Sequence, residues 1–337
     1  MRITREIMLK LARQAVDKKV RSDPTLFCIY LTGSLLQGEA MLGGTADIDL
    51  IFIHDRPQSI AREVEAVTED ISLDIAHYSV SDFQQPRALR NDPWMGSFLC
   101  QGPLVLHDKR HWFEYTQASV CAQFNHAEYV HRRAQSLAEQ ARAHWMDLHT
   151  ASLEGAPELM SYLRALEKAA NAIACLNGVP LSERRLFLDF PKRAEALGRP
   201  ELVPQLSELV MNQSITLDEW ESWGKSFTEA HATLARLKTC PPRLAALRLP
   251  YYVKAMNALV DDEPVSAMWI LLRTWTLTLT CLNPEYRGKK VWDEACSVLQ
   301  LDPEHLPERV EALDAFLDHI EELLDLYARR NGVISSI

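Results

Sequence analysis

The chain has 337 residues, of which 47% are hydrophobic and 24% are charged, and its formal net charge is −10 at pH 7. These values are typical of a globular protein of about two domains, and they exclude a disordered chain. They also argue against a nucleic-acid backbone as ligand, which is usually bound by a basic surface. No apolar run reaches the roughly 18 residues of a membrane helix, so no membrane partner is expected.

The first third of the chain alternates strand-like and helix-like segments. Residues 4–19 are predicted to form an amphipathic helix rather than a signal peptide, because charges interrupt each apolar block. Buried strands are predicted at 26–32, 47–54 and 71–80, a short helix or turn at 34–42, a helix at 57–70 and a broken strand at 98–108. This alternation favours a mixed β-sheet with flanking helices.

From about residue 115 the apolar pattern becomes helical. Helices are predicted at 126–149, 157–177, 200–212, 217–237, 241–260, 263–282, 289–299 and 307–330. The predicted fold class is therefore α+β. The expected domains are a sheet domain over 1–115 and helical bundles over 116–240 and 241–337, with one continuous helical domain as the alternative for the last two.

Seven cysteines are spread along the chain, and none forms a C-x-x-C pair. Their odd number predicts no disulfide framework. We therefore expect reduced thiols that mostly behave as small buried apolar side chains. This expectation favours a cytoplasmic protein.

Two aspartates at the start of the strand DIDLIFIH form the most informative pattern in the sequence. Asp47 and Asp49 share one face of the strand, with Cα atoms roughly 6–7 Å apart. Like charges in this position repel unless a proton or a cation lies between them. Asp74 lies within the next expected strand, between apolar residues. The three carboxylates together predict a site for Mg²⁺ or Mn²⁺, which prefer oxygen ligands.

The Gly33-Ser34 step forms the second half of the expected site. It follows the strand that ends at Thr32, where glycine permits a tight turn and a close backbone approach. The backbone N–H groups at the beginning of a following helix could bind phosphate. A nucleoside triphosphate carrying Mg²⁺ would satisfy both halves of the site.

Together these residues resemble the signature of the DNA polymerase β-like nucleotidyltransferase superfamily. The matching elements are Thr32-Gly33-Ser34, Asp47-Ile48-Asp49-Leu50 and the third carboxylate Asp74. The resemblance covers about residues 20–110, and the helical remainder is similar to the two-domain plan of the aminoglycoside nucleotidyltransferases. It implies an enzyme that transfers a nucleoside monophosphate, with AMP the first choice, from ATP or another triphosphate bound with two Mg²⁺ ions.

By the same similarity, residues of the helical part contribute to triphosphate binding. The resemblance implies Lys168 and Tyr162 as the nucleotide-binding candidates there, beside Gly33 and Ser34. Arg184 and Arg185 form a second basic pair that could face phosphates. A surface lysine and a solvated arginine pair are the ordinary alternatives for these positions.

The acceptor of the nucleotidyl group is open at this point. A cationic small molecule fits the acidic balance of the chain and is the first expectation. The alternatives are transfer to tRNA or to a protein, as in toxin-like members, and a catalytically silent nucleotide-binding module. The absence of P-loop, GxGxxG, HExxH and GxSxG motifs weighs against other common enzyme classes.

Overall fold

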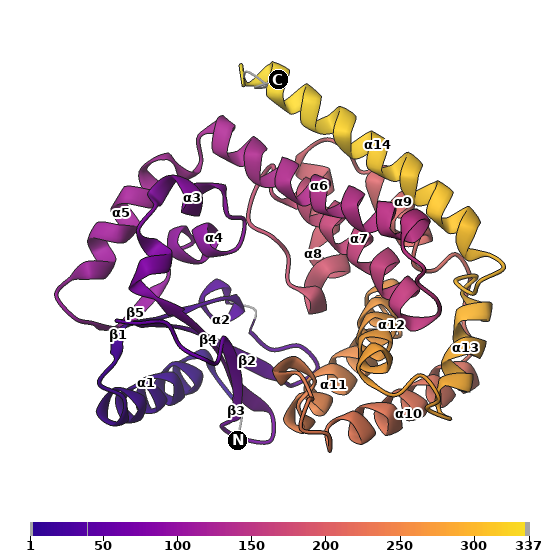
Figure 1. Cartoon of the computed structure of the whole chain (residues 1–337), viewed down its shortest axis with the longest axis horizontal. Coiled ribbons are helices and arrows are strands. Elements are labelled where there is room, and N and C mark those ends of the chain that lie inside the picture. Colours follow the sequence, from indigo (N-terminus) through magenta and orange to yellow (C-terminus); the bar gives the residue numbers. More distant parts are fainter. Residues whose placement is uncertain (1–2, 39, 334–337) are drawn as a thin grey trace. The chain divides into compact units, whose positions relative to one another are not determined.

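The computed structural model describes residues 3–38 and 40–333, and the protein is α+β (Figure 1). The chain divides into two compact units, residues 1–129, which contain the β-sheet, and residues 130–337, whose described part is mostly helical. Residues 116–129, which were expected in the helical part, belong to the sheet-containing unit. Helices α7 (Ala156–Ala174) and α12 (Pro264–Cys281) pack together within the second unit, so this unit continues across residue 240.

Five strands form the sheet in the order β3-β4-β2-β1-β5. Their bounds are β1 (Leu26–Thr32), β2 (Ala46–His54), β3 (Arg62–Ala66), β4 (Ile71–Ser79) and β5 (Leu104–Asp108). Strands β2 and β4 are parallel, and the other neighbouring pairs are antiparallel. The strand predictions for β1, β2 and β4 are therefore confirmed to within one residue at each end.

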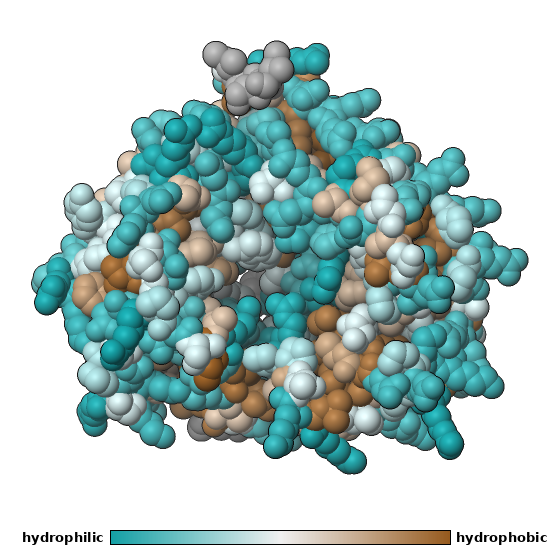
Figure 2. All heavy atoms as spheres, viewed as in Figure 1, coloured by the Kyte–Doolittle hydropathy of each residue, from teal (hydrophilic) through white to brown (hydrophobic). Residues whose placement is uncertain are grey.

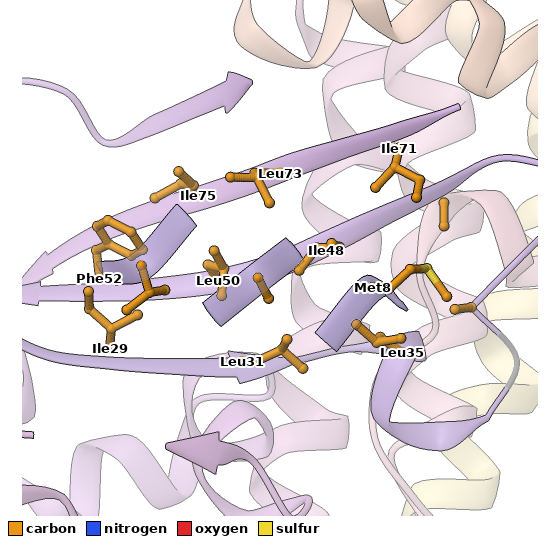
Figure 3. Packing of buried hydrophobic residues seen from close by; sticks show 14 of the residues in the cluster. Met8, Ile29, Leu31, Leu35, Ile48, Leu50, Phe52, Ile71, Leu73 and Ile75 are labelled. Atoms are coloured by element: carbon orange, nitrogen blue, oxygen red, sulfur yellow. The ribbon is translucent and has the colours of Figure 1, made fainter. Parts of the chain in front are cut away.

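Helix α1 (Arg5–Ser22) packs on one face of this sheet. Its buried residues Met8, Ala12 and Val16 recur every four positions, so they form a single apolar stripe. Met8 belongs to the same core cluster as the alternate residues of β2 and β4 on this face, which include Ile48, Leu50, Phe52, Ile71, Leu73 and Ile75, and Figure 3 shows it at one end of this row, close to Leu35. One face of β2 and of β4 is therefore buried in the core beneath α1.

The opposite face is covered by α3 (Pro86–Asn91), α4 (Met95–Cys100) and α5 (Trp112–Phe124). Ile51 and Ile53 of β2 pack there against residues such as Phe113 and Val120. Because side chains alternate along a strand, Asp47 and Asp49 lie on this same face. Along β2 the two aspartates come first, at the beginning of the strand. The apolar residues that these helices cover come after them.

The helix predicted over 57–70 is wrong: this segment contains the edge strand β3 and a hairpin into β4. The apolar spacing of Ile60, Val64 and Val67 suggested a helix, but Ile60 is exposed. The charges follow a period of two instead. Glu63 and Glu65 both pair with Lys19 of α1, which places them on the α1 face and Arg62 on the other.

The segment that follows β4 differs from expectation in two ways. Residues 98–108 do not form one broken strand, because α4 runs to Cys100 and β5 begins only at Leu104. The expectation of seven reduced thiols is also wrong. Cys100 at the end of α4 and Cys121 in α5 form a disulfide, and the other five cysteines are free. The pairing links two helices that were not expected from the sequence.

All α-helices of the second unit except α8 overlap a helix predicted from periodicity. The helices are α6 (Ala127–Thr150), α7, α8 (Leu186–Ala196), α9 (Leu202–Glu208), α10 (Leu217–Leu234), α11 (Leu249–Leu259), α12, α13 (Lys289–Val298) and α14 (Leu306–Arg330). Helix α8 was missed, since Pro191 lies inside it and proline usually ends a helix. The segment 241–260 begins with two 3₁₀ turns before α11.

The visible surface of the protein is mainly hydrophilic, as expected for a chain of average charge and hydrophobic content. Figure 2 shows hydrophilic residues over most of the visible face, with smaller hydrophobic areas between them. In the described part of the chain, no helix is long and apolar enough to cross a membrane.

A buried histidine in α10 gives a stability prediction. His231 has no exposed surface, and neither ring nitrogen has a hydrogen-bond partner among residues 3–38 and 40–333. Burial lowers its pKa to about 4, so the folded protein holds the neutral ring while the unfolded chain titrates near 6.5. The folded state then binds fewer protons between these values, and stability falls as the pH falls from 6.5 to 4.

The substitution His231→Phe removes this titration and keeps an aromatic ring of similar size. We expect the free energy of unfolding of the wild type to lose about 3 kcal/mol more than that of the variant between pH 7 and pH 4. Denaturant unfolding of both proteins at several pH values measures this difference. His54 and His77 also have lowered pKa values caused by burial, but they contribute equally to both proteins. Parallel pH profiles of the two proteins would contradict the prediction.

Candidate metal and phosphate site

The register of the sheet brings the three candidate aspartates together. In the parallel pair β2–β4, Asp49 lies directly opposite Asp74. In the antiparallel pair β1–β2, Asp49 lies opposite Thr32, the last residue of β1. The end of β1, the beginning of β2 and the first half of β4 therefore meet at one place on the sheet.

The carboxylates of Asp47, Asp49 and Asp74 converge there. Each offers one oxygen, and these three oxygens lie within 4.8 Å of one another. Asp47 and Asp74 are buried, with 8% and 4% of their surface exposed, and Asp49 is half-buried. Carboxylates held this close in a partly dry environment repel one another unless positive charge lies nearby.

The donor set fits a hard divalent cation. Mg²⁺ binds oxygen at about 2.0–2.1 Å, so two oxygens on one ion are at most about 4.2 Å apart. The three oxygens lie within 4.8 Å of one another, which is of the same order as this limit. Three carboxylates without nitrogen or sulfur ligands suit Mg²⁺ or Mn²⁺ better than Zn²⁺.

Gly33 lies against this cluster, and its backbone requires glycine. Its φ is +81° and its ψ is −164°, a region that residues with a side chain essentially do not adopt. A Cβ atom added at this position would lie 2.0 Å from Oδ2 of Asp49. The absence of a side chain therefore lets the Gly33-Ser34 backbone approach the Asp49 carboxylate.

Two local turns set up this approach. Ser34 begins the short helix α2 (Ser34–Gln37), in which Leu36 N–H donates to the Gly33 carbonyl. Further along, Leu42 and Thr45 exchange two backbone hydrogen bonds around Gly43 and Gly44, both of positive φ. A two-residue turn with positive φ at both positions is a tight reversal, and it delivers the chain directly into β2.

Arg62 is the part of the site that sequence reasoning missed. Its Nε donates to Oδ1 of Asp74 at 2.6 Å and its Nη2 donates to Oδ2 at 2.7 Å. Val64 lies opposite Asp74 in the β3–β4 pair, so Arg62, two residues earlier, reaches the same face diagonally. The alternation of charge in Arg62-Glu63-Val64-Glu65 was the available signal, but the segment had been expected to be a helix.

The residues predicted from the helical unit differ in what they can offer. Tyr162 of α7 has no exposed surface, and its hydroxyl donates to the Leu209 carbonyl at 2.8 Å. Burial also raises its pKa. A phenol enclosed in this way belongs to the helical core, so its assignment to nucleotide binding is corrected. Lys168 is half-buried on the same helix, and its role in triphosphate binding stays a prediction.

Arg184 belongs to a charged cluster of the helical unit rather than to a solvated arginine pair. It is buried, and its guanidinium stacks on the Tyr251 ring at 3.6 Å while Nη1 donates to the Tyr251 carbonyl. The neighbouring Glu183 pairs with Arg273 at 2.6 Å. Burial alone would raise the pKa of Glu183, but nearby arginines, chiefly Arg273, lower it to about 2. These contacts organise the turn before α8.

Comparisons with known proteins do not identify a family, so any functional assignment depends on the residues of the site. No protein-family model matches the chain, and no curated protein matches its sequence.

Proposed function

We propose that the protein is a metal-dependent nucleotidyltransferase that moves a nucleoside monophosphate, with AMP the first candidate, to a hydroxyl group of a small molecule. The observation that carries the proposal is the convergence of the Asp47, Asp49 and Asp74 carboxylates beside Gly33. Arg62 offsets part of the negative charge of this cluster. A bound divalent cation would offset more of it and would draw the phosphates of a substrate to the same place.

Each residue has a defined task in this proposal. Asp47 and Asp49 are the ligands of the divalent cation, and Asp74 completes the set. Gly33 permits the backbone of the Gly33-Ser34 turn to approach the leaving phosphates. When bound, Mg²⁺ supplies neutralisation of phosphate charge and lowers the pKa of an acceptor hydroxyl.

The reaction is a substitution at the α-phosphorus. A bond forms from the acceptor oxygen to phosphorus, the bond from phosphorus to the bridging oxygen breaks, and pyrophosphate leaves with that electron pair. The proton of the acceptor hydroxyl passes to a carboxylate of the site or to water. Most of the rate would come from positioning and electrostatic stabilisation, as in other phosphoryl transfers.

A small-molecule acceptor is favoured over nucleic acid by charge. The chain carries a net charge of −10, which disfavours a polyanionic acceptor and suits a neutral or cationic one. Transfer to tRNA or to the protein itself, and nucleotide binding without transfer, are the competing functions.

A transfer assay separates these functions. The full chain is incubated with Mg²⁺ and α-³²P-labelled nucleoside triphosphates, together with aminoglycosides, tRNA or no added acceptor. The proposal predicts label on a small molecule and release of pyrophosphate. Label on tRNA or on the protein would instead support the corresponding alternative. Nucleotide binding without any label would support the silent module. The absence of both nucleotide binding and label would refute the proposed enzyme.

A further inference from the structure

Asp74 forms an ion pair with Arg62 in addition to lying beside the other two carboxylates. The two guanidinium donors occupy one oxygen each of Asp74, which is the bidentate geometry of a strong charge-assisted pair. Asp74 is almost fully buried, whereas the Arg62 side chain is 44% exposed. The pair therefore joins a fixed carboxylate to a partner at the surface.

Arg62 and a cation compete for the same atoms. A metal ion at the carboxylate cluster would use an Asp74 oxygen that already accepts a hydrogen bond from Arg62. The guanidinium cannot resolve this conflict by losing its proton, since arginine stays charged in proteins. Its positive charge therefore opposes any cation that approaches Asp74.

The charge of Arg62 makes a second divalent ion less favourable than the first. The guanidinium already offsets part of the negative charge at Asp74, and a first bound ion offsets more of it. A second ion therefore approaches a less negative site until an anionic substrate enters.

The position of Arg62 permits its release. Strand β3 is the terminal strand of the sheet order, and the exposed side chain can rotate toward solvent without disturbing the core on the α1 face. A guanidinium that leaves a carboxylate binds phosphate oxygens with similar geometry. The phosphates of a nucleotide are therefore a suitable new partner for it.

We infer that Arg62 is a positioning residue that reserves Asp74, so that the resting site binds one divalent cation on Asp47 and Asp49 and admits a second only when Arg62 moves to a substrate phosphate. This inference rests on the proposed function, because it assumes that the carboxylates bind metal. It assigns the edge strand β3 a role in controlling how many ions the site holds.

The test is Mn²⁺ binding to the full chain, followed by electron paramagnetic resonance without nucleotide. The wild type is expected to bind one ion. Arg62→Gln removes the positive charge and the paired guanidinium donors. It is expected to bind a second ion or to bind the first at least 10-fold more tightly. Arg62→Lys keeps the charge without the paired donors, so its Mn²⁺ binding is expected to lie between that of the wild type and that of Arg62→Gln. Arg56→Gln removes an exposed arginine paired with its neighbour Asp55 and should match the wild type.

The outcomes separate this inference from the proposed function. Identical Mn²⁺ stoichiometry and affinity in the wild type and Arg62→Gln would overturn the inference, as would two ions in the resting wild type, while the metal site itself would stand. Binding by Arg62→Gln alone would also overturn the inference, because the resting wild type would then bind no ion, while a metal site at the carboxylates would stand. Binding by none of the folded proteins, with folding checked by thermal unfolding, would overturn both the inference and the metal-dependent function.

Discussion

Asp49→Asn is expected to reduce nucleotidyl transfer by about 10³-fold or more, because a metal ligand contributes several kcal/mol of transition-state stabilisation. Mn²⁺ affinity should fall by more than about 100-fold, which exceeds the usual effect of residues that only orient a ligand. The variant keeps the shape of the side chain and loses only its charge. The expected losses therefore report on ion binding and not on packing.

The stability of the same variant should change in the opposite direction. Asp47, Asp49 and Asp74 lie close enough to repel one another, so removing one charge relieves this repulsion in the metal-free protein. We expect an equal or higher melting temperature than in the wild type, and a smaller rise when Mn²⁺ is added. Asp55→Asn is the matched control, since Asp55 follows β2 directly and is exposed. Wild-type Mn²⁺ affinity in Asp49→Asn would contradict the site assignment.

Gly33→Ala is the second substitution with a large expected effect. The added methyl group would lie 2.0 Å from Oδ2 of Asp49, so either the carboxylate or the turn has to move. We expect Mn²⁺ affinity to fall at least 100-fold. We also expect the free energy of unfolding to fall by about 1–3 kcal/mol, because the backbone conformation at Gly33 is strained for alanine. Metal titration and denaturant unfolding measure the two effects.

Two further variants isolate the contact from the backbone strain. Gly102→Ala also introduces a side chain at a positive φ, but nothing lies within 4 Å of its added Cβ. It should lose some stability and keep wild-type Mn²⁺ affinity. In the double variant Gly33→Ala/Asp49→Ala, the second substitution removes the Oδ2 and Cγ atoms that the added methyl group would meet, so it should be more stable than the sum of the single effects predicts. Additive effects would show that Gly33 and Asp49 do not interact as described.

The sequence predicted best the parts of the sheet where burial is strongest. Strands β1, β2 and β4 are continuous apolar runs with few interruptions, and Asp47, Asp49 and Asp74 stand out in them because they interrupt this pattern. The sequence indicated that a neighbouring strand could bring Asp74 beside the other two aspartates, and the structure supplies the register that places it opposite Asp49. This part of the site required only local patterns and one pairing.

The parts that were missed depend on contacts between distant segments. Strand β3 is short and half-exposed, and its apolar residues match helical spacing by chance. Its true position is set by pairing with β4 and by Lys19 of α1. Arg62 became visible as a partner of Asp74 only through that pairing. Similarly, the burial of Tyr162 and the Cys100–Cys121 disulfide depend on packing that periodicity does not specify.

The most direct test of the proposed function is the binding of a nucleoside triphosphate analogue that carries a methylene group between its α- and β-phosphorus atoms. Calorimetry measures its affinity for the wild type and for Asp47→Asn/Asp49→Asn, each with Mg²⁺ and with EDTA. The account predicts binding by the wild type in Mg²⁺ only, and at least 100-fold weaker binding in the other three cases. Equal affinity with EDTA, equal affinity in the double variant, or no binding by the wild type would contradict it.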